Sequence, residues 1–147
     1  MFLGEYQHTL DAKGRVILPA RFRDQLAGGA VIAKLDGCLA VYPLEEWNDV
    51  ANEVREIAKR GHAERQAARA FFAGAAEIEP DKQGRVAIPT NLREYARLER
   101  DVVVTGAFSR IEIWDSSVWR ERNAEGEANL LAEPAAEQPI NLSDFGM

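Results

Sequence analysis

The chain uses one short stretch twice. Residues 11–19 read Asp-Ala-Lys-Gly-Arg-Val-Ile-Leu-Pro, and residues 81–89 read Asp-Lys-Gln-Gly-Arg-Val-Ala-Ile-Pro. Between residues 11–26 and 81–96, 6 of 16 positions are identical at a constant offset of 70. Two copies are too few for a solenoid, because stacked repeats need about three or more units to bury a continuous core. The repeat therefore predicts a pseudo-twofold domain in which each half completes the other.

Each copy of the repeat predicts a tight turn followed by a strand. Asp11 and Asp81 suit the start of a type I turn, and Gly14 and Gly84 suit its last position, which favours positive φ. The strand ends at a proline, which can open a short helix. In each copy an aspartate and an arginine flank the turn closely enough to form an ion pair. The basic residues expected at or beside the two exposed tips are Lys13, Arg15, Lys82 and Arg85.

Hydrophobic patterning in the rest of the chain predicts a mixture of strands and helices. The predicted strands cover residues 4–10, 16–18, 31–35, 38–42, 74–80, 86–88, 102–106 and 111–114. The predicted helices cover residues 21–26, 43–60, 62–73 and 90–97, and a last one follows Asp115. Beyond the short helices the offset between the halves becomes 72, which predicts a two-residue insertion near Glu99 and Arg100.

The formal net charge of −6 argues against DNA binding through a generally basic surface, but the charge is unevenly distributed. Residues 121–147 carry a net charge of −5, whereas residues 11–26 and 81–97 each carry +2. The local field, rather than the total charge, attracts a polyanion to a surface. The positive charge is therefore doubled together with the motif.

Several functional classes find no support in the sequence. It has no nucleophile elbow, no phosphate-binding glycine loop and no metal-ligand spacing, so we expect no enzyme, no cofactor and no metal site. Asp11 and Asp81 are poor general acids, because the arginine four residues after each favours the ionised carboxylate. No apolar run is long enough to cross a membrane, and the N-terminus lacks a signal pattern, so we expect a cytoplasmic protein. Cys38 lies in an apolar run and is expected in the core.

The doubled Asp-x-x-x-Arg motif, in a chain that begins Met-Phe-Leu-Gly-Glu-Tyr, resembles the MraZ family of bacterial transcriptional regulators. Each half is similar to an AbrB-type swapped-hairpin module. The resemblance implies an α+β fold, with a β-rich double-split barrel built from the two halves and helices added to it. The expected organisation is a first repeat with its following helix (1–60), a spacer helix (61–73), a second repeat with a final helix (74–123) and an acidic flexible tail (124–147).

The resemblance also implies a function. It indicates a sequence-specific DNA-binding regulator of the division and cell-wall gene cluster, associated with the nucleoid, that acts as a homo-oligomeric ring on repeated sites in promoter DNA. The residues that it implies for DNA contact are Arg15 and Arg85, with Lys13 and Lys82 beside them. Asp11, Asp81, Gly14 and Gly84 would support the turns.

Two alternatives remain open at this level. The Asp–Arg pair could be a turn staple that recognises nothing further. The chain could also be an oligomeric scaffold without DNA binding, because Phe71 and Phe72 at the end of the spacer could anchor it either on the barrel or on a neighbouring subunit. A truly basic tip would favour DNA binding, and a mixed, neutral tip would favour the scaffold.

Overall fold

The computed structural model describes residues 1–132, and it divides into a body, Met1–Asp115, and a second unit that begins at Ser116. The strands are β1 (Glu5–Thr9), β2 (Arg15–Ile17), β3 (Ala30–Leu35), β4 (Cys38–Pro43), β5 (Ala76–Ile78), β6 (Arg85–Ala87), β7 (Asp101–Gly106) and β8 (Ile111–Asp115). The helices are α1 (Ala20–Asp24), α2 (Leu44–Ala58), α3 (His62–Gly74), α4 (Thr90–Tyr95) and α5 (Ser116–Leu131). The predicted α+β class is confirmed.

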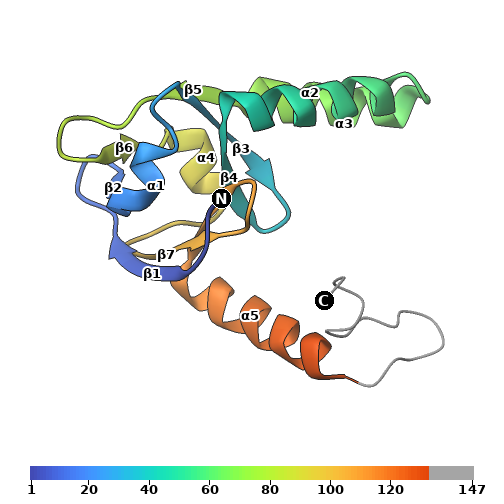
Figure 1. The fold of residues 1–147 in the computed structure, drawn as a ribbon. Helices are drawn as coiled ribbons and strands as arrows, with labels where there is room; N and C mark the ends of the chain where they lie inside the picture. Colours follow the sequence, from blue (N-terminus) through green and yellow to red (C-terminus); the bar gives the residue numbers. More distant parts are fainter. Residues whose placement is uncertain (133–147) are drawn as a thin grey trace. The chain divides into compact units, whose positions relative to one another are not determined.

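The two halves exchange strands (Figure 1). Six strands form one antiparallel sheet in the order β1-β7-β8-β4-β3-β5, and β2 and β6 form a separate two-stranded ribbon. The first half's β1 pairs with the second half's β7, and the second half's β5 pairs with the first half's β3. Each half thus supplies an edge strand to the other. The hydrogen-bonded strands of residues 1–132 do not close into a barrel, since β1 and β5 are the edges of the larger sheet.

The strand register also locates the insertion in the second half. Tyr6 lies opposite Val104, and Ala76 lies opposite Ile32. Tyr6 and Ala76 are equivalent residues of the two halves and are 70 positions apart. Their partners Ile32 and Val104 are also equivalent, but they are 72 positions apart. The two extra residues therefore enter between α4 and β7, in agreement with the sequence prediction.

The core of the body lies between the six-stranded sheet and the β2–β6 ribbon. Val16 and Val86, the central residues of the ribbon strands, are almost fully buried, and so are Phe22 of α1 and Leu92 of α4. Burying a side chain of this size contributes roughly 1.5–3 kcal/mol each. The equivalent positions of the two halves therefore anchor the ribbon and both short helices on the same core.

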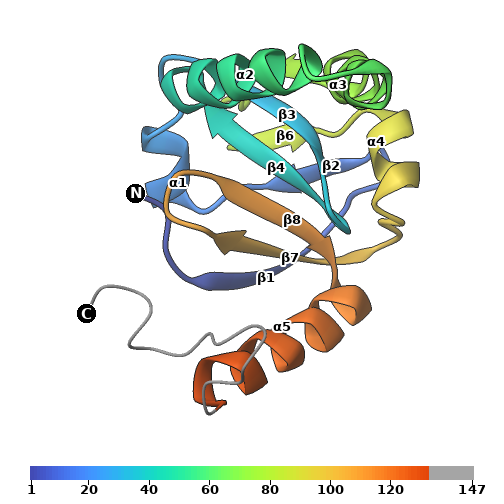
Figure 2. The same cartoon turned by 90° about the vertical axis from the view of Figure 1, so that its right-hand side faces the viewer.

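Helices α2 and α3 cover the other face of β3 and β4 (Figure 2). Trp47 of α2 stacks on Phe71 of α3, with ring centroids 5.5 Å apart and an interplanar angle of 21°. Tyr42 of β4 lies beneath Trp47, at 5.9 Å. Phe71 therefore anchors the spacer within its own chain. Phe72 touches Trp47 edge-on and is 37% exposed.

Helix α5 extends the ordered chain beyond the expected start of the tail. The acidic composition predicts a flexible tail from Ala124, and this prediction is wrong for residues 124–131 because these are helical. This stretch is rich in alanine, glutamate and leucine, which favour helix strongly enough to offset Gly126. The remainder of the expected tail, residues 133–147, lies outside the described residues. No helix within residues 1–132 has the length and apolar character needed to cross a membrane.

Candidate functional site

The first copy of the motif forms a turn closed by Asp11, and residues 11–15 are called the first turn below. One carboxylate oxygen of Asp11 accepts hydrogen bonds from the backbone N–H groups of Lys13 and Arg15, both at 2.9 Å. The other oxygen accepts from Nε of Arg15 at 2.7 Å. Gly14 has a φ of 73° and donates its N–H to the Asp11 carbonyl at 3.0 Å. The predicted turn and ion pair are both present.

The second copy has the same hydrogen-bond pattern in residues 81–85, which are called the second turn below. Asp81 accepts from the backbone N–H groups of Gln83 and Arg85 at 2.9 Å, and from Nε of Arg85 at 2.8 Å. Gly84 has a φ of 82° and donates to the Asp81 carbonyl at 2.9 Å. The two copies of the sequence therefore have the same turn geometry, including a glycine with positive φ at the same position.

These hydrogen bonds hold both aspartates in the charged form. The pKa of Asp11 lies below its usual value, first because the Arg15 backbone N–H donates to its carboxylate and then because the Arg15 side chain does so. The pKa of Asp81 is lowered by the equivalent groups of Arg85. Each turn therefore carries a permanent anion that orients a guanidinium at physiological pH.

The β2–β6 ribbon directs both motif arginines to one face. The strands are antiparallel, with Val16 opposite Val86 and both side chains buried. Because side chains alternate along a strand, the flanking positions point away from the core. These outward positions are Arg15, Ile17, Arg85 and Ala87. Arg15 and Arg85 therefore lie diagonally across one outer face, and Ile17, which is 47% exposed, is the cross-strand neighbour of Arg85 on that face.

The motif arginines keep part of their hydrogen-bonding capacity. The side chains of Arg15 and Arg85 are 26% and 29% exposed, and each uses Nε for its aspartate. Within residues 1–132, no hydrogen bond uses the Nη atoms of either arginine. Lys13 and Lys82 are exposed at the turns beside them. Each staple thus fixes a guanidinium while leaving its outer N–H groups available.

The structure adds two arginines to the site, beyond the residues that the sequence predicts for it. A β-carbon at Gly14 would overlap the guanidinium of Arg93, which comes from α4 of the other half. A β-carbon at Gly84 would likewise overlap the guanidinium of Arg23, from α1. Positions 23 and 93 are both arginine in the alignment of the two repeats, and this identity is the sequence signal that marks them. We call Arg23 and Arg93 the cross-repeat arginines.

Each turn also accepts a backbone hydrogen bond from the opposite half. The carbonyl of Gly14 accepts the N–H of Ile88, and the carbonyl of Gly84 accepts the N–H of Leu18, both at 3.0 Å. The antiparallel register puts the two turns at opposite ends of the ribbon.

The cross-repeat arginines raise the positive charge of both tips. The first turn gathers Lys13, Arg15 and Arg93 around Asp11. The second turn gathers Lys82, Arg85 and Arg23 around Asp81. Each tip thus combines three cations with one carboxylate, which makes it basic.

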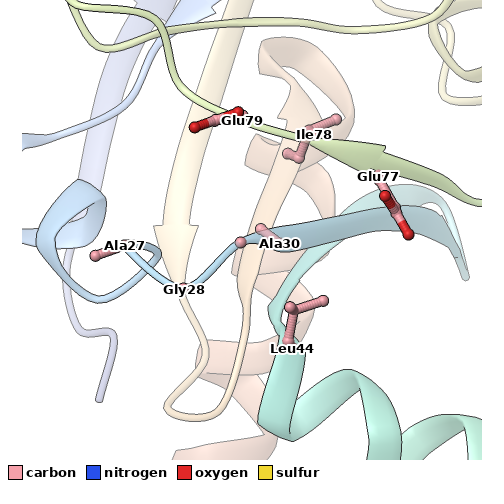
Figure 3. Close-up of a pocket in the computed structure, with 8 residues that line it drawn as sticks. Ala27, Gly28, Ala30, Leu44, Glu77, Ile78 and Glu79 are labelled. Carbon is pink, nitrogen blue, oxygen red and sulfur yellow. The ribbon is translucent and has the colours of Figure 1, made fainter.

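A hollow of about 510 Å³ lies elsewhere on the body (Figure 3). It is bordered by the Gly28–Gly29 segment, by Leu44 at the start of α2 and by Glu77 and Glu79 on and after β5. None of the predicted site residues lines it. Its two carboxylates make it unsuitable for a polyanion, so the candidate site is the ribbon face and its turns.

Comparison with known proteins gives the same division of the chain. A family model described as "MraZ protein, putative antitoxin-like" matches residues 1–70 and, a second time, residues 71–139. The chain belongs to the MraZ family. Each MraZ match contains one copy of the turn, and the strand exchange described above joins the two repeats within residues 1–115 into one body.

Curated MraZ relatives are similar over their full length. A protein of Acetivibrio thermocellus called "Transcriptional regulator MraZ" is 50% identical over 143 residues, which is 97% of this chain and 99% of the relative. Proteins with the same name from Desulforamulus reducens and Clostridium beijerinckii are each 46% identical, over 97% and 100% of this chain. The expected family is thus confirmed across both halves.

Proposed function

We propose that this chain is a sequence-specific DNA-binding transcriptional regulator of the division and cell-wall gene cluster. In this proposal the outer face of the β2–β6 ribbon reads DNA through Arg15 and Arg85, with Lys13 and Lys82 beside them. The protein acts in the cytoplasm, at the nucleoid. The names of the MraZ relatives support the regulatory role.

One observation carries the proposal: two stapled arginines project from the same exposed face of a two-stranded ribbon. The major groove of B-DNA is wide enough to admit such a ribbon. Arginine is well suited to guanine edges, because its planar fork matches two acceptors at once. The unused Nη groups of Arg15 and Arg85 are the donors available for this contact.

The local charge supports a polyanionic ligand despite the acidic total. Each tip combines three cations with one aspartate, whereas the chain as a whole carries −6. The pure staple hypothesis explains the Asp–Arg pair but not the additional arginine that lies over each turn. A scaffold without DNA binding would be favoured by neutral tips, whereas the tips of this chain are basic.

The proposal includes a homo-oligomeric ring acting on repeated promoter sites. Phe72 supports a contact between subunits, because it stays 37% exposed beside the aromatic cluster of α2 and α3. A ring that presents many ribbons gains avidity when the DNA sites recur at matching spacing. We also infer that the body corresponds to a double-split barrel, in which the exchanged strands and the separate ribbon enclose one core although their hydrogen bonds form two open sheets.

The test begins with genomic DNA. Purified protein is mixed with sheared genomic fragments, and the recovered fragments are sequenced. The proposal expects enrichment of the promoter region of the division and cell-wall cluster, with a short sequence occurring in several copies. Recovery without enrichment of any sequence, together with a stable oligomer, would contradict the proposal and favour the scaffold.

A further inference from the structure

The cross-repeat arginines differ in how they are held. Arg93 donates from Nη2 to the hydroxyl of Thr90 at 2.9 Å, and from Nη1 to the carbonyl of Lys13 at 3.4 Å. In the first half the position of Thr90 is taken by Ala20, which has no hydroxyl. The buried Nε of Arg23 has no hydrogen-bond partner among residues 1–132. One tip thus has a fixed arginine, and the other has an arginine with unused donors.

An unpaired guanidinium N–H is costly once it is removed from water, so its state in this structure calls for an explanation, and a ligand from outside the chain is one. Arg23 lies over Gly84, and the second turn contains the exposed Lys82. Since no side chain of the described residues holds its Nε, Arg23 can reorient towards an anion at little cost in protein contacts.

The position of Arg23 and Arg93 favours contacts with DNA phosphates over contacts with bases. The outward face of the ribbon is occupied by Arg15 and Arg85, whereas Arg23 and Arg93 lie beside the turns at the two ends of the ribbon. A ribbon inserted in a groove meets the sugar–phosphate backbones at its margins, and contacts there fix register without reading sequence.

We propose that Arg23 and Arg93 bind DNA phosphates, each completing the tip built by the other repeat. This inference rests on the proposed DNA-binding function. Arg93 is held in place by Thr90 before DNA binds, whereas Arg23 gains its missing hydrogen-bond partner when DNA binds. Because each tip takes its third cation from the opposite half, neither repeat alone carries a complete phosphate-binding tip.

The test measures binding of Arg23→Ala and Arg93→Ala to two fluorescein-labelled duplexes over a series of salt concentrations. One duplex carries the sequence enriched from the genome, and the other has the same length and a scrambled sequence. Loss of a phosphate contact should weaken binding to both duplexes by the same factor, roughly tenfold, because phosphates carry no sequence information. It should also make the slope of log K against log salt shallower by about 0.9.

Arg21→Ala is the matched control. Arg21 is exposed on the same short helix as Arg23, and its removal changes the net charge equally. It should leave the salt slope almost unchanged. Arg23→Lys and Arg93→Lys should largely keep the native salt slope, whereas Arg23→Gln and Arg93→Gln, which have no charge, should not. Melting temperatures of the same preparations identify misfolded variants. If an alanine variant does not fold, the comparison of the lysine and glutamine variants tests the proposal in its place.

The outcomes separate this inference from the function on which it rests. If the native chain fails to bind either duplex, the proposed function itself is wrong. If Arg15→Ala loses specific binding while Arg23→Ala and Arg93→Ala behave like Arg21→Ala, only the phosphate role is overturned. A loss of affinity with an unchanged salt slope would also overturn it, because the arginines would then be merely structural.

Discussion

The guanidinium of Arg93 occupies the space where a β-carbon at position 14 would stand. Arg23 and Gly84 have the same relationship at the other end of the ribbon. The glycine in each motif therefore has two physical reasons. It permits a positive φ in its own turn, and it leaves room for an arginine of the opposite half.

We expect Gly14→Ala to destabilise the turn and weaken DNA binding together. The backbone at φ 73° would cost roughly 1–2 kcal/mol with a β-carbon present. The flexible end of Arg93 would move aside, which displaces its charge from the first turn. Chemical denaturation and DNA titration on the same variant measure the two effects.

The background Arg93→Ala provides the control for this substitution. The backbone cost should persist in the double variant, because it arises within the turn. The loss of affinity should be no larger than in Arg93→Ala alone, since the arginine to be displaced is already absent. Fully additive losses of affinity would show that Gly14 acts without Arg93.

Arg15→Ala and Arg85→Ala should separate binding from stability. A bidentate contact to a base contributes roughly 1–3 kcal/mol of discrimination, so each substitution should lower affinity for the enriched duplex about tenfold or more. The melting temperature should change little, because exposed ion pairs stabilise a fold only weakly. Lys82→Ala should act in the same direction but less strongly.

Fluorescence titration and thermal melting of the same preparations check this prediction. In a closed ring the loss should be amplified, because every subunit loses its contact at once. Unchanged affinity in the Arg15/Arg85 double variant, with the oligomer intact, would leave the turn-staple hypothesis standing and remove the motif from DNA recognition.

Phe71→Ala and Phe72→Ala should have different consequences although the residues are adjacent. Phe71 stacks on Trp47, so its removal should lower the free energy of unfolding by about 1.5–3 kcal/mol. Phe72→Ala should instead shift the sedimentation profile towards smaller species, because its exposed ring is proposed to contact a neighbour. About 0.5 M salt, which screens charges, should leave the native profile intact. Dissolution by salt, with the Phe72 variant still assembled, would mean that charges hold the oligomer.

The aspartates of the two turns predict a specific response to acid. Their pKa values are lowered in the folded chain, so their contribution to stability is complete above the unfolded value of 3.8 and is lost as the pH falls through the folded pKa. The stability difference between the native chain and the Asp11→Asn/Asp81→Asn variant should therefore be constant from neutral pH to about pH 5, and should shrink below pH 3.8. Denaturation at several pH values measures it. A difference that already falls between pH 7 and 5 would contradict this origin.

The sequence was most informative where chemistry is local. The turns at Asp11 and Asp81 follow from residue spacing, and the ion pairs follow from the same few residues. The predicted strands 31–35 and 38–42 do pair, and Cys38 is buried as expected, because the two apolar runs and the short turn between them are contiguous in the sequence.

Contacts between the halves were harder to predict because they depend on register over long separations. Nothing near Gly14 in the sequence indicates that Arg93 will lie on it, although the identity of positions 23 and 93 marks both arginines. The full length of α5 is hard to predict, because the acidic composition of residues 124–131 favours a flexible segment while their helix propensity favours the observed helix. The different roles of Phe71 and Phe72 required the position of Trp47.

The exchange of edge strands also governs how the chain can fold during synthesis. The partner of β1 is β7, whose first residue, Asp101, follows the last residue of β1, Thr9, by 92 positions. Until the ribosome has released β7, the first half has β3 and β4 but neither the second half's contribution to the core nor a partner for β1. Such long-range pairing is slow and leaves apolar surface exposed meanwhile. The body must therefore form late in translation, in a step that joins both halves, and the nascent first half depends on prompt completion of the second to escape aggregation.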